Sequence, residues 1–123
     1  MSRRNAIRLA VTAVVLLTAA AGWLWFMPTG SGELEHSPNG RYTAHAHNLS
    51  TGTLLGGRDW YIQVRVVEEA SGAEVWRVVH RHPAGADVTD YGSRARRFIT
   101  WAADSATVTV PVTGGRELVL VVP

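Results

Sequence analysis

Residues Leu9 to Met27 read LAVTAVVLLTAAAGWLWFM, an apolar stretch without a charged side chain. At about 1.5 Å of rise per residue, a helix over this stretch is about as long as the roughly 30 Å hydrocarbon core of a bilayer is thick. Three arginines, Arg3, Arg4 and Arg8, precede it. The stretch therefore predicts a transmembrane helix, and we expect residues 1–28 to form an N-terminal signal-anchor.

The end of the apolar stretch bears on whether it is removed. A cleavable signal peptide ends in small residues, and Ala19, Ala20 and Ala21 would satisfy that requirement. Cleavage there would leave a strongly apolar N-terminus. At the end of an uncleaved helix, in contrast, Trp23 and Trp25 suit the aromatic belt of a membrane interface. We therefore favour the uncleaved anchor.

Charge predicts the orientation of this anchor. Arginines crowd its N-terminal flank, whereas residues 28–40 on the other flank carry Glu33 and Glu35 and no arginine or lysine. The positive-inside rule therefore places the N-terminus in the cytoplasm and the rest of the chain outside, in a single-pass protein of a bacterial cytoplasmic membrane. The side chains expected at the membrane interfaces are Arg3, Arg4, Arg8, Trp23 and Trp25.

Beyond the anchor the chain is nearly neutral. Three of its 12 basic residues precede the apolar stretch, and the 10 acidic residues balance the remainder. A nucleic-acid-binding domain would concentrate positive charge on one face, so we expect no nucleic acid partner. The chain has no cysteine, which excludes a disulfide framework, a thiol nucleophile and a Cys-based metal site.

The remaining chain divides into a short connection and one domain. Residues 29–40 are small, polar and turn-prone, as expected of a tether. Residues 41–123 exceed the roughly 60 residues at which a single hydrophobic core becomes workable. We expect them to form one extracytoplasmic β-domain.

Alternating side chains predict antiparallel strands in this domain. From Trp60 to Glu68, apolar residues recur at every second position, the period of a half-buried strand. A Gly-containing connection separates this run from Glu74 to His80, so the two should form a hairpin. Further β-prone runs are Arg41 to Leu49, Arg97 to Trp101, Ala106 to Val112 and Glu117 to Val122, the last three read as a meander. The predicted fold class is mainly β, one N-terminal transmembrane helix followed by a small antiparallel domain of about six strands, a sandwich or a curled meander.

The same alternation predicts the core. The side chains expected to be buried are Trp60, Ile62, Val64, Trp76, Val78, Val108, Val110, Leu118 and Leu120. The segment from Pro83 to Arg96 lacks a periodic pattern. Its Pro, Gly and Asp content predicts a surface loop, with a helical turn near Val88 to Tyr91.

Two turn sequences resemble those of a known family. Ser37 to Tyr42 reads SPNGRY, which is similar to the Ser-Pro-Asp-Gly-Arg/Lys-Tyr opening of strands in bacterial TolB-type propeller repeats. Trp101 to Ser105 reads WAADS, which resembles the Trp-x-x-Asp-Ser turn of those repeats. A closed propeller needs roughly four to eight blades of four strands, and this domain has strands for little more than one. The resemblance therefore implies a small membrane-anchored β-protein and transfers no active site.

Histidine is the residue type that comes closest to a metal-binding pattern. His45 and His47 are two residues apart, and so are His80 and His82, so in an extended chain each pair projects from one face. On neighbouring strands the four imidazoles could bind zinc or copper. Neither pair includes an acidic side chain, so we interpret them as surface histidines and expect no cofactor.

Other motifs are weaker. No serine lies in a Gly-x-Ser-x-Gly elbow, so a hydrolytic nucleophile has no local support and we do not expect an enzyme. Leu54 and Leu55 lie among glycines that predict a flexible hairpin connection. The arginines of the loop, which could contact an anionic lipid surface or an acidic partner, are Arg94, Arg96 and Arg97.

Together these patterns predict an interaction module. A membrane anchor followed by a domain without a recognisable catalytic motif suits docking against another membrane or envelope protein. We therefore expect an accessory or structural subunit of a bacterial envelope complex. The alternatives are a His-based metal-binding envelope domain and a hydrolase.

Overall fold

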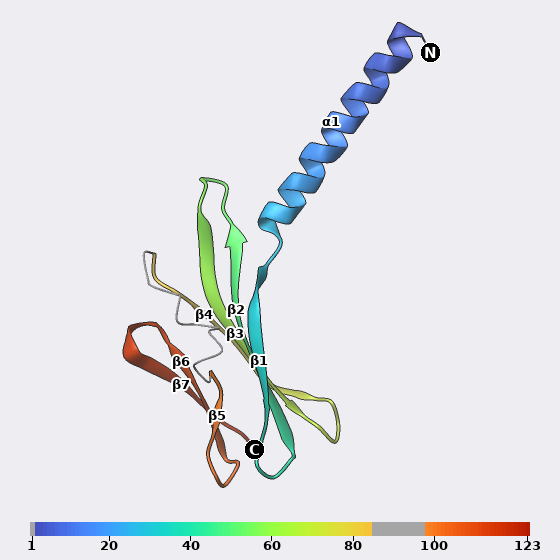
Figure 1. Cartoon of the computed structure of the whole chain (residues 1–123). Coiled ribbons are helices and arrows are strands. Elements are labelled where there is room, and N and C mark those ends of the chain that lie inside the picture. The colour runs from blue at the N-terminus through green and yellow to red at the C-terminus, as the bar shows by residue number, and fades with distance from the viewer. Residues whose placement is uncertain (1, 85–97) are drawn as a thin grey trace.

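The chain consists of one N-terminal helix and two antiparallel sheets (Figure 1). The structure is a computed structural model that describes residues 2–84 and 98–123. Helix α1 (Arg3–Phe26) is followed by sheet A, whose strands lie in the order β1 (Thr29–His36), β2 (Tyr42–Gly52), β3 (Arg58–Glu68) and β4 (Glu74–Arg81). Sheet B contains β5 (Thr100–Trp101), β6 (Thr107–Val112) and β7 (Arg116–Val121), with the 3-10 turn η1 (Thr113–Gly115) between the last two. The mainly β fold class is confirmed.

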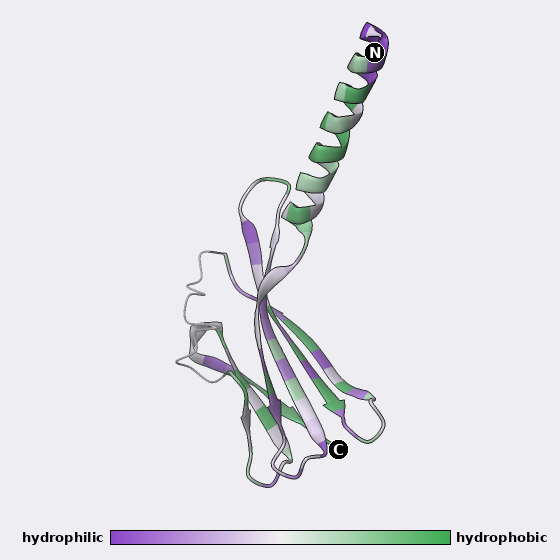
Figure 2. Cartoon of the chain, turned by 45° about the vertical axis from the view of Figure 1, so that its right-hand side comes forward, coloured by the Kyte–Doolittle hydropathy of each residue, from purple (hydrophilic) through white to green (hydrophobic). Residues whose placement is uncertain are grey.

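Helix α1 projects away from the sheets (Figures 1 and 2). It is long and apolar enough to cross a membrane, with a mean hydropathy of 2.0 over its most apolar window. The hydroxyl of Ser2 caps its first turn by accepting a hydrogen bond from the Asn5 N–H. None of its residues is buried by the rest of the chain. A helix that is apolar over most of its length and has no buried residue matches a membrane anchor or a signal sequence.

The tether predicted over residues 29–40 is replaced for most of its length by a strand. Strand β1 pairs antiparallel with β2, from Thr29 opposite Ser50 to His36 opposite Thr43. Glycine is needed at position 30, since a Cβ there would lie 1.9 Å from the carbonyl oxygen of Asn48. Close approach of a neighbouring backbone is one reason for glycine within a strand. Composition alone made the same residues resemble a linker.

The predicted strands are found, although the run predicted from Arg97 to Trp101 is a strand only over Thr100–Trp101. Strands β3 and β4 form the expected hairpin, in which Val64 lies opposite Val78. Strands β5, β6 and β7 form the expected meander. The additional strand is β1, which extends sheet A at the edge formed by β2.

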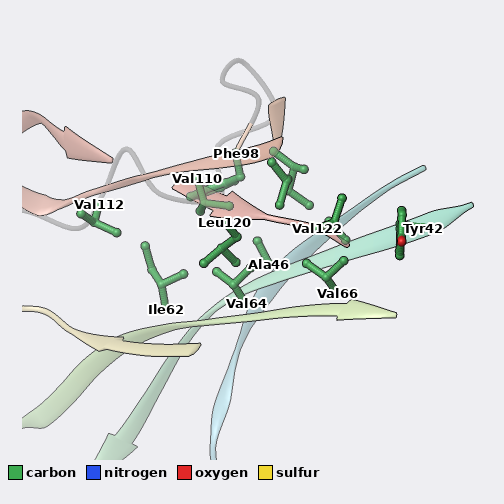
Figure 3. Close-up of a cluster of buried hydrophobic side chains, with 13 residues drawn as sticks. Tyr42, Ala46, Ile62, Val64, Val66, Phe98, Val110, Val112, Leu120 and Val122 are labelled. Carbon is green, nitrogen blue, oxygen red and sulfur yellow. The ribbon is translucent and has the colours of Figure 1, made fainter. Parts of the chain in front are cut away.

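The hydrophobic core lies between the two sheets (Figure 3). Sheet A contributes side chains from the face of β2 and β3 that we call its inner face, and sheet B contributes them from β6, β7 and the residues before β5. The buried apolar residues are Tyr42, Ala44, Ala46, Ile62, Val64, Val66, Phe98, Ile99, Val108, Val110, Val112, Leu120 and Val122. Burial of each large apolar side chain stabilises the fold by about 1.5–3 kcal/mol.

Two tryptophans predicted to be buried are instead partly exposed. Trp60 is 37% and Trp76 39% exposed, although their register partners on β2 and β3 place both on the inner face. Sheet B has fewer and shorter strands, so it leaves the end and edge of sheet A uncovered. The Trp76 indole spans this edge and donates a hydrogen bond to the carbonyl oxygen of Val121 at 2.7 Å. Of the other predicted core residues, Val78 and Leu118 are half-buried against the core.

Candidate functional site

The end of α1 is fixed to the β-domain by side-chain contacts. The Trp25 indole covers Gly52, where a Cβ would lie 2.3 Å from Nε1. That Nε1 donates a hydrogen bond to the carbonyl oxygen of Thr53 at 3.1 Å. The guanidinium of Arg58 lies over the indole, 5.3 Å from the ring centroid, a cation–π arrangement. The last turn of α1 therefore packs on the hairpin formed by β2 and β3.

Arg58 also holds the first residue of β1. Its Nη2 donates hydrogen bonds to Thr29 Oγ1 at 3.0 Å and to the carbonyl oxygen of Ser50 at 3.1 Å. Its Nε donates to Ser50 Oγ at 2.9 Å. One guanidinium therefore connects α1, β1 and β2. Since only Met27 and Pro28 separate α1 from β1, the junction leaves little freedom between helix and domain.

The hairpin connection between β2 and β3, residues 53–57, is called the β2–β3 tip below. Leu54 is 91% and Leu55 99% exposed. Gly56 and Gly57 have φ of 82° and 84°, which complete the turn in the left-handed region. The tip lies beside the last turns of α1 in both views (Figures 1 and 2). The exposed leucines and the helix end are thus on the same side of the domain.

The residues predicted for the membrane interfaces lie at the two ends of α1. Arg3, Arg4 and Arg8 are in its first turns and are exposed. Trp23 is 73% exposed, whereas Trp25 is 39% exposed because it packs on the β-domain. The two tryptophans of the predicted aromatic belt therefore differ in their contacts, since Trp25 packs on the β-domain and Trp23 is largely exposed.

Sheet A has an outer face, opposite the core, that sheet B does not cover. Strand register aligns Leu34, His45, Arg65 and Arg77 in one row across its four strands. The next row consists of Gly32, His47, Gln63 and Val79. At the two edges of this face, Leu34 is 48% and Val79 53% exposed. The outer face thus presents apolar side chains at its edges and imidazole and guanidinium groups between them.

Charge on the outer face is organised around Glu74. Its carboxylate accepts hydrogen bonds from Arg65 Nε at 2.6 Å and from Arg77 Nε at 2.7 Å. These bonds, that of Arg77 first, lower the pKa of Glu74 from its ordinary 4.5 to about 2. Burial, and then the charge of Arg65, lowers the pKa of His45. The His45 imidazole, in one row with Leu34 and Arg65, is therefore harder to protonate than a free imidazole.

The two histidine pairs lie on opposite faces of sheet A. His45 and His47 are on the outer face, with ring centroids 6.4 Å apart. His80 is opposite Ile62 and so on the inner face, and His82 Nε2 lies 3.2 Å from Asn48 Oδ1. The four-histidine site considered from the sequence is therefore not formed. Within residues 2–84 and 98–123, no group of three or more His, Cys, Asp or Glu could hold a metal ion.

The two turns with the TolB-type resemblance contact each other. The Asn39 N–H donates a hydrogen bond to Ser105 Oγ at 3.0 Å, and the rings of Tyr42 and Trp101 stack at 6.4 Å. Ser37 Oγ donates to Asn39 Oδ1 and accepts from the Tyr42 N–H. These polar groups form hydrogen bonds with one another, so the two turns join the two sheets and have a structural role.

A hollow of about 280 Å³ lies beside these turns. Its lining residues are Glu35, His36, Pro38, Ile99, Thr100 and Trp101. His36 Nδ1 lies 2.8 Å from Thr43 Oγ1 and 3.7 Å from a Glu69 carboxylate oxygen, so this nitrogen is directed to the outer face rather than to Glu35. The Nδ1 atom of His36 is therefore engaged with Thr43 and Glu69 outside the hollow.

Several sequence predictions fall outside the described residues. They are the binding arginines Arg94, Arg96 and Arg97, the helical turn near Val88 to Tyr91, and most of the loop from Pro83 to Arg96. No protein-family model, curated protein or solved structure matches the chain. A function must therefore be inferred from the geometry of three features. They are the junction of Trp25 with Gly52, Thr53 and Arg58, the β2–β3 tip, and the outer face of sheet A.

Proposed function

We propose that this chain is a single-pass membrane protein with its N-terminus in the cytoplasm and its β-domain on the extracytoplasmic side. The domain acts as an interaction module, an accessory or structural subunit of a bacterial envelope complex. The observation that carries the proposal is the junction of Trp25 with Gly52, Thr53 and Arg58. A flexible tether would let the domain turn freely above a membrane, whereas this junction presents it in one orientation.

The outer face of sheet A is the docking surface in this proposal. Its side chains combine exposed Leu34 and Val79 with Arg65 and Arg77. Protein interfaces are enriched in arginine, and removal of exposed apolar side chains from water is favourable. A partner that fits would offer apolar side chains with carboxylates near them. Such a partner is another membrane or envelope protein, since the junction would hold the whole domain close to the membrane.

Two measurements test the anchor. The full-length chain should stay in membranes through a carbonate wash, and added protease should digest the β-domain only from the extracytoplasmic side. A soluble mature chain that begins near Gly22 would contradict the anchor. Digestion from the cytoplasmic side would contradict the orientation.

Site-specific photocrosslinking tests the docking surface. A photoreactive amino acid at Val79, on the outer face of sheet A, should give a discrete adduct in membranes. Val119 provides the matched control, because it is a similarly exposed valine, 57% against 53%, and lies on the outward side of sheet B. Replacement of Leu34 by Asp should reduce the Val79 adduct. Equal adducts from both positions, or none from Val79, would overturn the assignment of this face.

A further inference from the structure

We propose that the β2–β3 tip inserts Leu54 and Leu55 into the extracytoplasmic leaflet of the membrane that α1 crosses. The domain would then contact the membrane at two places, the helix and the tip. This inference rests on the proposed function, in which α1 remains attached as an anchor. In this inference the β2–β3 tip contacts the lipid bilayer rather than a protein.

The first argument is position along the membrane normal. Strand β1 starts at Thr29, opposite Ser50, and the hairpin continues past this level through the pair Gly52 and Arg58 to the tip. At about 3.3 Å per residue, the tip extends roughly 13 Å beyond the start of β1. Met27 and Pro28 lie between the end of α1 and the start of β1, so this reach brings the tip to the level of the last turn of α1, where Trp25 Nε1 bonds the carbonyl oxygen of Thr53. Figures 1 and 2 show the tip beside this part of the helix.

The second argument is the chemistry of the tip. Leu54 and Leu55 are almost fully exposed, at 91% and 99%, and residues 53–57 include no charged side chain. Turns usually carry Gly, Pro, Asn, Asp or Ser, so two adjacent leucines are not required by the turn itself. Removal of apolar surface from water is favourable, and with α1 as an anchor the lipid leaflet is the apolar phase beside this turn.

The third argument is that the backbone of the tip is internally hydrogen-bonded. The Thr53 N–H donates to the carbonyl oxygen of Gly57 at 3.1 Å, and the Gly56 N–H donates to that of Thr53 at 3.3 Å. The Thr53 hydroxyl donates to the carbonyl oxygen of Gly56 at 2.7 Å. Backbone groups must be paired where water is excluded, and these bonds pair the groups of Thr53, Gly56 and Gly57 that flank the two leucines.

The chain has no cysteine, so a single introduced cysteine reports one position. We would label Leu55→Cys with an environment-sensitive fluorophore in the full-length chain, reconstituted in vesicles of phosphatidylethanolamine and phosphatidylglycerol. The expected result is a blue-shifted emission that spin-labelled lipids quench and aqueous iodide does not. The matched control is Ser71→Cys in the opposite turn of β3, which should be quenched by iodide alone. Adding Leu54→Asp to Leu55→Cys should return the emission toward that of the control.

The outcomes separate this inference from the anchor. If the chain leaves the vesicles in a carbonate wash, the anchor fails and the inference fails with it. If the chain is retained but iodide quenches the probe at position 55 as strongly as the one at position 71, the inference alone is overturned. A probe protected from both quenchers would mean that protein covers the tip, which also overturns insertion into lipid.

Discussion

Strand β3 has a five-residue hairpin turn at each end, and the two turns differ in the chemistry of their side chains. The β2–β3 tip beside α1 carries Leu54 and Leu55, whereas the turn to β4, residues 69–73, carries Glu69 and Ser71. Both turns use glycine with positive φ. Because the backbone demands are similar, they do not explain two leucines at one end and polar groups at the other. The difference follows the position of the helix, with apolar side chains at the end beside α1 and charged ones at the far end.

The middle of β3 should be far more sensitive than either turn. Ile62 is fully buried between the sheets, so Ile62→Ala should lower the free energy of unfolding by about 2–5 kcal/mol. Leu55→Ser should change it by less than about 0.5 kcal/mol, since the side chain contacts water or lipid in place of the core. Urea denaturation of the full-length chain in detergent measures both. Comparable losses of unfolding free energy in the two variants would show that the tip packs within the domain, contrary to the contrast between the two turns.

Arginines at the two ends of the hairpin provide a second comparison. Arg58 lies over Trp25 at the end beside α1, and Arg41 lies over Tyr42 at the far end, with cation–ring distances of 5.3 and 5.4 Å. Arg58→Gln should cost about 1 kcal/mol through its lost hydrogen bonds. It should also broaden the distribution of distances between spin labels on α1 and on sheet B.

Arg41→Gln is the control, because Arg41 does not connect the helix to the domain. Its ion pair with Glu68 is long, at 3.7 Å, and exposed, so a small effect on stability is expected. The distances between α1 and sheet B should keep their wild-type distribution. If both variants broadened it equally, the junction at Arg58 would not be what orients the domain.

Sequence periodicity predicted most of the sheets because it reports local geometry. The run predicted from Trp60 to Glu68 is found as Arg58–Glu68, since alternation reflects which side chains face the core. Strand β1 was missed because Gly30 and Gly32 look like linker residues until their neighbours are known. The close approach of the Asn48 backbone, which requires glycine at position 30, comes from pairing between segments apart in the sequence.

The candidate sites were harder to predict, because they depend on register and on long-range contacts. Alternation correctly put His45 and His47 on one face, but only the register shows that His80, opposite Ile62, is on the other. Leu55 was read as part of a flexible connection. Its significance appears only when β1 pairs with β2 and brings Trp25 onto the hairpin.

The smallest expected effect is a pH dependence confined to the far end of β3. Bonds from Arg77 and Arg65 hold the pKa of Glu74 at about 2 in the folded chain, below its ordinary 4.5. A carboxylate with a lowered folded pKa stabilises the fold above the unfolded pKa, and this stabilisation is lost as pH falls through the folded pKa. The wild type should therefore exceed Glu74→Gln in stability at pH 7, and the difference should shrink between about pH 4.5 and 2.

The end beside α1 should not share this dependence, because residues 53–57 contain no titratable side chain. Urea midpoints of wild type and Glu74→Gln at several pH values measure the far end, and the Leu55→Cys probe in vesicles measures the tip over the same range. We expect the midpoints to converge in acid while the emission of the probe stays constant. A constant gap between the midpoints would show that Glu74 contributes no charge-dependent stability. A probe that moved into water over the range in which Glu74 titrates would show that the two ends of β3 are coupled, contrary to the contrast drawn between them.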